Sequence, residues 1–535
     1  MRYYDCIKKH ITSQRILFFS ILLFAFFIRL YKLDSLPPGI NQDEAMGAVD
    51  AWALSEYGTD RYGMRWPVHF TAWKYGQMSV LMSYCMIPFI KILGFTTLAV
   101  RLPIALISSL CVAVMYGISR KLFSEKLSLA VMAFAAINPW QFMQSRWALD
   151  CNLFPHMFLI GFYLLLCGLE KRRCLYLSMV FFGLTFYCYG VAVYTVPVFL
   201  VLFAAWCLWQ KEFAWKEILL SALVFFMVAL PEILTMFINM FKLPSIETPL
   251  FTIPYFPESM RSNDILFLNF SWHQLGRNAL SMWKQAFLQK QDYIYNALPQ
   301  FGPLYRFSTP FLLLGIISFF IHTFAEKDSR KKTLRMSLCS FFVMGIWTGL
   351  MTFEVNINRI NIIFYSLIFL TVYGFYCLGR VLTRYATAVY GTVVMIYMIL
   401  AAAFLNQYFT TIGSSLHTMF NVDFLHIMKD ADQMEEYDTL YVTSHMGWQM
   451  NYRMSEILAH YACRIDSRYY QGLTNETGGR ELLPYNERYH FTDIAWLQSF
   501  DTEALYVLHK SDLQYIKSEY DIVMQEGDFL AIDLR

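Results

Sequence analysis

Charged residues are scarce in this chain. Of its 535 residues, 16% are charged and 57% are hydrophobic, a composition far from that of soluble domains. The sequence therefore predicts a polytopic α-helical membrane protein. The formal net charge is only +3, and the basic residues fall in short loops between apolar runs. Such a distribution forms no nucleic-acid-binding surface, so no nucleic-acid partner is expected.

Paired cysteines, repeats and linkers are also missing. The eleven cysteines form no Cys-x-x-Cys pair and no metal-ligand spacing, and several lie inside apolar runs, among them Cys85, Cys111 and Cys167. They are interpreted as small hydrophobic residues, which excludes a disulfide framework or a zinc site. The chain shows no repeat of solenoid period, no low-complexity segment and no Gly/Ser linker, so a repeat array is not indicated.

Long apolar runs, in contrast, are abundant. A bilayer core requires about 20 apolar residues for each crossing helix. We predict about eleven transmembrane helices, over residues 16–33, 98–119, 127–143, 153–169, 174–190, 192–209, 217–240, 309–325, 334–352, 360–378 and 386–405.

The positive charges between these runs predict the orientation. Basic clusters at 120–126, 171–173, 211–216, 327–335 and 380–384 should all be cytoplasmic. They are so only if the further apolar run 78–93, which contains Pro88, does not cross. That run is therefore predicted to lie as an interfacial helix on the outer surface. The N-terminus is then inside and the C-terminus outside.

This topology predicts the domain organisation. Residues 1–405 form the transmembrane domain, with a first external loop at about 34–97 and a large one at about 241–308. Residues 406–535 are more polar. They alternate β-like runs (439–442 and 504–508) with a helical pattern at 449–461, which is typical of a small α/β domain, here extracytoplasmic.

The segment PPGINQDE at 37–44 follows the first span and precedes a helical pattern over 43–57, which Gly58 should end. Asp43 and Glu44 therefore lie at a helix N-terminus. One interpretation is capping, because Asp is a favoured N-cap and acids in the first turn suit the helix dipole. The other is catalysis, because charge held at a membrane boundary commonly marks a reaction centre. The two roles are compatible.

Three arginines lie at the outer ends of predicted spans: Arg101, Arg146 and Arg359. Each could extend to lipid headgroups or bind a phosphate, which guanidinium groups suit. We expect phosphate binding by at least one of them. Asp150 is a third outward carboxylate. It is a candidate metal ligand together with Asp43, or an ion-pair partner of Arg146 four residues earlier.

The order of these features resembles a known superfamily. A first span, PPGINQDEA at 37–45, GTD at 58–60, an amphipathic run ending in Gly94, and RLP at 101–103 are similar to the GT-C membrane glycosyltransferases. The similarity is greatest to the family 39 branch, which contains the dolichyl-phosphate-mannose–protein mannosyltransferases and the aminoarabinose transferases. It covers residues 16 to about 190, and the later spans and the tail only by architecture.

The resemblance implies roles for particular residues. Asp43 would be the general base and Glu44 its acidic neighbour, Arg101 would contact the lipid phosphate, and Asp150 would be the acid that opens the fourth span. Arg359 would be the basic residue of a late external loop, and Arg146 remains a further candidate for the phosphate. The chain lacks the Lys-Pro of the aminoarabinose transferases, and Lys74 is the nearest lysine.

The implied function is transfer of a sugar from a polyprenyl-phosphate-linked donor, with inversion, to an extracytoplasmic acceptor, which is a cell-envelope glycan, a lipid or a protein. The enzyme would be a multi-pass protein of the cell membrane with its active site facing outward. No cofactor is required by the sequence, although a divalent metal ion is a candidate. The main alternative is a transporter or flippase of lipid-linked sugars. A related fold that has lost catalysis and binds a partner is a third.

Overall fold

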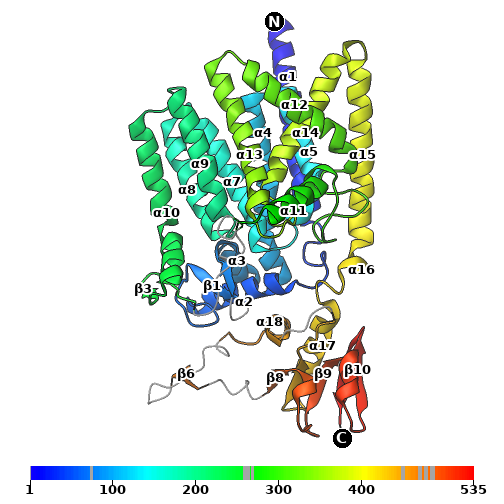
Figure 1. The fold of residues 1–535 in the computed structure, drawn as a ribbon. Helices are drawn as coiled ribbons and strands as arrows, with labels where there is room; N and C mark the ends of the chain where they lie inside the picture. The colour runs from blue at the N-terminus through cyan, green and yellow to red at the C-terminus, as the bar shows by residue number, and fades with distance from the viewer. Residues whose placement is uncertain are drawn as a thin grey trace. The chain divides into compact units, whose positions relative to one another are not determined.

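The structure, a computed structural model, describes residues 2–72, 76–256, 266, 270–447, 452–467, 473–474, 480–481 and 488–534. It is mostly helical (Figure 1) and divides into two compact units. The first unit contains residues 1–31, 102–234 and 260–410, and the second contains residues 32–101, 235–259 and 411–535.

The first unit is built from long apolar helices. They are α1 Arg2–Leu30, α4 Thr97–Leu122, α5 Glu125–Ile137, α6 Pro139–Gln144, α7 Asp150–Gly168, α8 Arg172–Leu184, α9 Ala192–Trp209, α10 Trp215–Phe241, α11 Trp272–Met282, α12 Thr309–Ala325, α13 Ser329–Met351, α14 Ile363–Val381 and α15 Ala386–Thr410. The first residues of α4 and the last of α10 belong to the second unit.

Nine helices of the described part are long and apolar enough to cross a membrane, and they coincide with nine of the predicted spans. The predicted spans 127–143 and 174–190 fall on shorter helices. Pro139 interrupts the first, so that α5 has 13 residues and α6 has 6. α8 also has 13 residues before it passes into a 3-10 turn at Thr185. Thirteen residues rise only about 20 Å, against a core of about 30 Å. The number of crossings stays a prediction.

Close helix packing in this unit depends on glycine. α12 and α14 are in contact, and Gly315 of α12 lies against Gly374 of α14. A Cβ atom at Gly315 would lie 1.8 Å from the carbonyl oxygen of Leu370, and one at Gly374 would lie 1.9 Å from that of Phe311. Only glycine lets the two backbones approach so closely, as is common between membrane helices.

The second unit begins with the loop that the sequence predicts to be the first external one. It contains α2 Gln42–Tyr57, the antiparallel strands β1 His69–Ala72 and β2 Gly76–Ser79, and α3 Leu81–Leu93. The run 78–93 thus ends in a helix of 13 residues, and its place in the membrane interface stays a prediction. Strands β3 Ile246–Glu247 and β4 Thr252–Ile253 form a second small hairpin.

The tail of the chain adds an α/β domain to this unit, as predicted. Its sheet has the order β10-β11-β9-β5-β8, in which β5 is parallel to both β8 and β9 and the other neighbours are antiparallel. The elements are α16 Ile412–Leu416, α17 Val422–Asp432, β5 Leu440–Thr443, α18 Tyr452–Ala462, β8 Tyr489–Thr492, β9 Leu505–His509, β10 Asp521–Glu526 and β11 Phe529–Asp533, with a separate pair β6 Leu473–Thr474 and β7 Arg480–Glu481.

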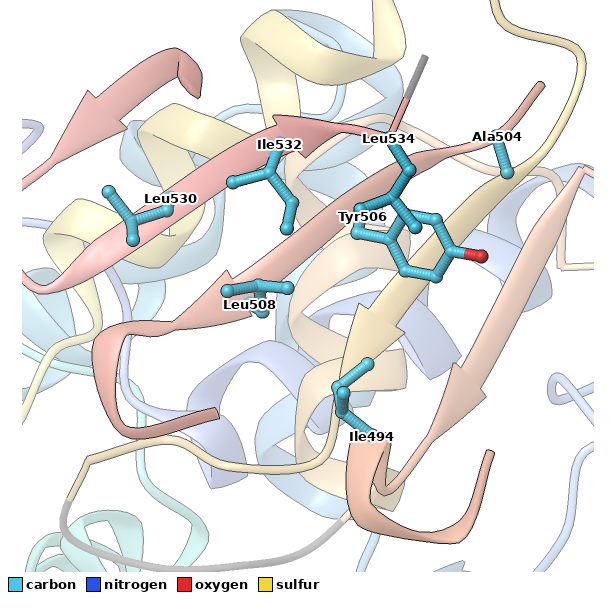
Figure 2. Packing of buried hydrophobic residues seen from close by; sticks show 7 residues of the cluster. All are labelled: Ile494, Ala504, Tyr506, Leu508, Leu530, Ile532 and Leu534. Atoms are coloured by element: carbon cyan, nitrogen blue, oxygen red, sulfur yellow. The ribbon is translucent and has the colours of Figure 1, made fainter. Parts of the chain in front are cut away.

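The two faces of this sheet are covered differently. α17 packs against β9, β10 and β11, and α18 packs against β5 and β8. The opposite face carries an apolar cluster that includes Tyr506, Leu508 and Ile532, with Ile494 of the 3-10 helix η7 Ile494–Trp496 packed onto it (Figure 2). Alternate residues of each strand therefore supply two separate cores.

The tail and the first external loop share one compact unit, although the sequence predicts a boundary at 405/406. The contacts that join them include the following. The Ile40 backbone N–H donates to the Phe420 carbonyl at 2.9 Å, the Tyr57 hydroxyl donates to Asp466 at 2.8 Å, and the hydroxyls of Thr97 and Tyr461 lie 2.8 Å apart.

Candidate functional site

The first turn of α2 carries the acidic pair, as predicted. The N-cap is Asn41, whose Oδ1 accepts the Asp43 backbone N–H at 3.1 Å. Gly58 ends the helix with φ +69°, also as predicted. Because the cap is Asn41, Asp43 is not needed as the capping residue, and its carboxylate lies where the helix dipole stabilises a negative charge.

The loop before α2 is fixed against the tail. Gly39 has φ +61°, and a Cβ atom there would lie 2.2 Å from the Phe420 carbonyl oxygen. The Asn421 side-chain amide donates to the Ile40 carbonyl at 3.1 Å, beside the Ile40–Phe420 bond. Glycine is therefore required at position 39, and the loop holds the start of α2 in one place.

Glu44 is held by Arg101 at the start of α4. The two carboxylate oxygens accept from Nε and Nη2 of Arg101, each at 3.0 Å, and both side chains are 0% exposed. The remaining guanidinium N–H groups donate to the carbonyls of Leu33 (3.4 Å), Pro37 (2.7 Å) and Gly39 (2.8 Å). In this structure every N–H group of Arg101 is engaged within the protein, whereas the resemblance implies a contact with a lipid phosphate.

Asp43 and Glu44 therefore differ in their exposure to solvent. Glu44 is completely buried in its ion pair, while Asp43 is partly exposed.

A second buried ionic group lies further along the same loop, and the sequence analysis did not identify it. Asp50 of α2 is bonded to Arg61, whose Nη2 also donates to the Thr71 carbonyl at 2.7 Å. The backbone N–H groups of Tyr62 and Met64 donate to Asp60 at 3.0 and 2.9 Å. The signal in the sequence was a single acid, Asp50, within an apolar helix face.

The pKa values of Asp50 and Asp60 are both raised. Burial raises the pKa of Asp60 to about 8, with the nearby charge of Asp50 adding to the shift. Burial also raises the pKa of Asp50, and Arg61 opposes that shift.

Arg146 belongs to the first unit, where it caps the end of α1. Nη1 donates to the carbonyls of Ile28 and Arg29 at 3.0 Å each, and Nη2 donates to that of Tyr31 at 2.9 Å. The guanidinium also lies over the rings of Phe142, Tyr408 and Phe409. A cation at a helix C-terminus satisfies carbonyls that have no partner in the helix, so this geometry supports a structural role.

Asp150 and Arg359 also lie in the first unit. Asp150 begins α7 and accepts the Cys151 backbone N–H at 2.7 Å. Arg359 is partly exposed, and its Nη1 donates to the Glu354 carbonyl at 3.1 Å.

A chain of amides in the same unit ends at a buried oxygen, and the sequence analysis missed it. Asp292 accepts the Ile357 backbone N–H at 2.6 Å and the Asn296 side-chain amide at 3.1 Å. The Asn296 oxygen in turn accepts the Gln144 amide at 3.0 Å, so the Gln144 oxygen points away, without a partner among the described residues. Burial raises the pKa of Asp292, against the effect of the Ile357 N–H. Lone acids and amides in loops are too common for sequence alone to single these out.

Comparison with known proteins shows which fold the chain has. Residues 78–234 match a family model described as dolichyl-phosphate-mannose-protein mannosyltransferase. The crystal structure of ArnT from Cupriavidus metallidurans bound to undecaprenyl phosphate is similar over 97% of this chain and 98% of its own, with a TM-score of 0.58 and 12% identity. The chain shares the fold of this ArnT.

The apo form of the same ArnT gives a TM-score of 0.58 at 11% identity over 98% of each chain. The apo oligosaccharyltransferase of Archaeoglobus fulgidus gives 0.51 at 12% identity, over 83% of this chain and 64% of its own. No curated protein sequence matches the chain. The GT-C-like fold that the first loop leads us to expect is thus confirmed.

Lys74 lies outside the described residues. Asp43 and Asp150, the candidate metal ligands, belong to different units. Among the described residues, no group of three His, Cys, Asp or Glu side chains is placed to hold a metal ion.

Proposed function

We propose that this protein transfers a sugar from a polyprenyl-phosphate-linked donor to a hydroxyl group of an extracytoplasmic acceptor, with Asp43 as the general base. The acceptor is a cell-envelope glycan, a lipid or a protein. The observation that carries the proposal is the different state of two adjacent acids, because Glu44 is buried against Arg101 while Asp43 is partly exposed.

The chemistry follows from this arrangement. The acceptor oxygen forms a bond to the anomeric carbon while its proton moves to Asp43. The bond from that carbon to the phosphate oxygen breaks, and its electron pair stays on the leaving lipid phosphate. Attack from the side opposite the leaving group inverts the anomeric centre. A positioned base of this kind contributes about 10² to 10⁴ in rate.

The leaving phosphate gains negative charge and requires a cation. Arg359 is a basic residue for which the resemblance implies such a role, and it is partly exposed. The guanidinium N–H groups of Arg101 donate to Glu44 and to carbonyls of the loop before α2. Arg146 caps α1. Lys74 is a second candidate, from the sequence alone.

The proposal also says which side of the membrane the active site faces and where the substrates meet. The active site faces the outside of the membrane, which rests on the positions of the basic loops. We place the acceptor and the donor headgroup beside α2, where irregular backbone at the membrane boundary would be tolerable in a polar cavity within the protein.

The test is the Asp43→Asn variant. The lipid-linked sugar that copurifies with the wild type is identified by mass spectrometry, and release of polyprenyl phosphate from that donor is then measured. We expect Asp43→Asn to lower the rate by at least about 10²-fold with unchanged thermal stability. Glu56→Gln, an exposed acid on the same helix, is the matched control and should keep the wild-type rate. Wild-type turnover by Asp43→Asn would sink the assignment.

A further inference from the structure

The carboxyl ends of β5 and β9 carry a polar cluster that the proposed sugar transfer does not use. His445 follows β5, and His509 is the last residue of β9. Their ring centroids lie 4.5 Å apart. Ser511 and Asp512 come directly afterwards in the 3-10 helix η8 Lys510–Tyr515.

The topology places this cluster where α/β sheets commonly bind ligands. β5 and β9 are adjacent and parallel. The chain that leaves β5 leads to α18, which contacts α17 on one face of the sheet. The chain that leaves β9 forms η8, whose Leu513 packs on the opposite face, against the cluster of Figure 2. Connections that leave neighbouring parallel strands to opposite faces mark a topological switch point, outside which ligands bind.

Hydrogen bonds fix which nitrogen of His445 carries a proton. Asp512 is buried, and its carboxylate accepts from the Thr443 hydroxyl at 2.6 Å and from the His509 backbone N–H at 3.1 Å. Its other oxygen lies 3.3 Å from Nδ1 of His445. Because a carboxylate only accepts, the proton of neutral His445 is on Nδ1, and its Nε2 is an acceptor.

The opposite tautomer follows for His509. Its Nδ1 accepts the Ser511 backbone N–H at 3.3 Å, and the Ser511 hydroxyl lies 2.8 Å from the same nitrogen. That hydroxyl is also 2.6 Å from Nδ1 of His445, from which it can accept. An accepting Nδ1 leaves the proton of neutral His509 on Nε2, which is therefore a donor.

Both outer nitrogens are accessible. The two rings are partly exposed, and within the described part of the chain neither Nε2 has a hydrogen-bond partner or counts among the buried polar atoms that lack one. Gly447, with φ +77°, lies beside the site, and a Cβ atom there would lie 3.5 Å from Nε2 of His509. A glycine at this position keeps the approach open.

The charges in this cluster indicate which kind of ligand fits it. The cluster carries no permanent cation, because Lys510 is paired with Asp528 at 3.1 Å, so it offers little to an anion. No third metal ligand joins the two histidines among the described residues. In their neutral forms the two rings offer one donor beside one acceptor, which suits hydroxyl groups, since these donate and accept at once.

We propose that His445 and His509 bind hydroxyl groups of a neutral saccharide, at a site separate from the sugar transfer at Asp43. The site gives the outer domain its own affinity for a glycan. The proposal does not depend on the proposed function, since binding is measured without transfer.

The test is saturation-transfer difference NMR on the full-length protein in nanodiscs, with the methyl glycosides of glucose, galactose and mannose as probes. His445→Asn and His509→Asn are the informative variants. An asparagine can keep the inner hydrogen bond of Nδ1 while it removes the outer Nε2. Each should weaken binding of the preferred glycoside by about tenfold, the loss of one hydrogen bond, with unchanged thermal stability.

The matched control is His490→Asn, which changes an exposed histidine of β8 in the same sheet and should bind as the wild type does. Wild-type affinity in both informative variants overturns the proposal, as does the absence of binding by any of the glycosides. If the signal disappears in Asp43→Asn but persists in the histidine variants, the glycoside occupies the transfer site and the proposal is also wrong. Parallel titrations with inorganic phosphate and Zn²⁺ should leave His445 and His509 unaffected at neutral pH. Binding of either probe there, without glycoside binding, contradicts a saccharide site.

Discussion

Arg101 forms a two-point ion pair with Glu44, 57 residues earlier in the chain, and neither side chain is exposed to solvent. The pair joins the start of α4 to the first turn of α2, and the same guanidinium holds the carbonyls of Pro37 and Gly39. The backbone that leads to Asp43 is therefore fixed by a residue that the resemblance assigns to substrate binding.

Arg101→Met should destabilise the protein by about 3–5 kcal/mol, because it removes the guanidinium that pairs with the buried carboxylate of Glu44. Thermal unfolding in detergent measures the loss. Arg65→Met, at an exposed arginine of the same loop, should change stability by less than about 0.5 kcal/mol.

The double variant Glu44→Gln/Arg101→Met separates charge from packing. It removes both charges, so it should be more stable than Arg101→Met alone. If Arg101→Met unfolds as the wild type does and only weakens donor binding, Arg101 is a phosphate ligand and the ion pair is dispensable.

Arg146→Met should also act on stability rather than on donor affinity. It leaves three carbonyls at the end of α1 without their donor, and each buried unsatisfied group costs about 1–3 kcal/mol. Arg173→Met, at an exposed arginine in the first turn of α8, is the control in the same thermal-unfolding assay. An Arg146→Met protein of normal stability that fails to bind the lipid donor would show that capping is not the main role.

Stability should fall as the pH rises, because of Asp60. Burial raises the pKa of Asp60 to about 8, above its usual value of about 3.9. Between these values the folded state binds a proton that the unfolded state releases, so this contribution is complete below about pH 4 and is lost as the pH passes 8.

Asp60→Asn should flatten the dependence of thermal stability on pH between 5 and 9. The amide oxygen can still accept from Tyr62 and Met64, which bond to Oδ1, while the titrating group is gone. Equal slopes for wild type and variant would show that Asp60 is ionised in the folded protein.

Membrane orientation is tested by cysteine labelling in a background whose native cysteines have been replaced. Lys331→Cys, at an exposed position in the first turn of α13, should be unreachable by an impermeant thiol reagent in intact cells, because its basic loop is predicted to be cytoplasmic. Trp496→Cys, at a position that is 75% exposed in the outer domain, should react. Labelling at 331 in intact cells would overturn the predicted topology.

Much of the fold follows from local pattern. Apolar length predicts nine helices that the structure contains, and Gly58 ends α2 where the periodicity stops. The prediction is less accurate where a local break divides an apolar run. Asn138 and Pro139 end one helix and begin the next, and composition averaged over a span does not register such a break.

The candidate site likewise has features that could be predicted from the sequence and features that could not. The position of Asp43 and Glu44 in the first turn of a helix could be predicted, because capping residues and helical spacing are local. The partners of Glu44 and Arg146 could not, since a guanidinium selects among all the carboxylates and carbonyls that the fold brings within reach. The chain of amides at Asp292 joins residues more than a hundred positions apart. No residue near Asp292 in the sequence indicates these partners.

The sequence by itself determined the class of protein, the helical architecture and the acid at the start of α2, because hydrophobic length, turn residues and helix ends act over a few residues. Only the tertiary structure decided that Glu44 is buried while Asp43 stays accessible, that Arg101 and Arg146 hold backbone, and that His445 and His509 meet at one edge of a sheet. Those facts depend on contacts between distant segments, and their energies are set by burial, which exists only once the chain has folded.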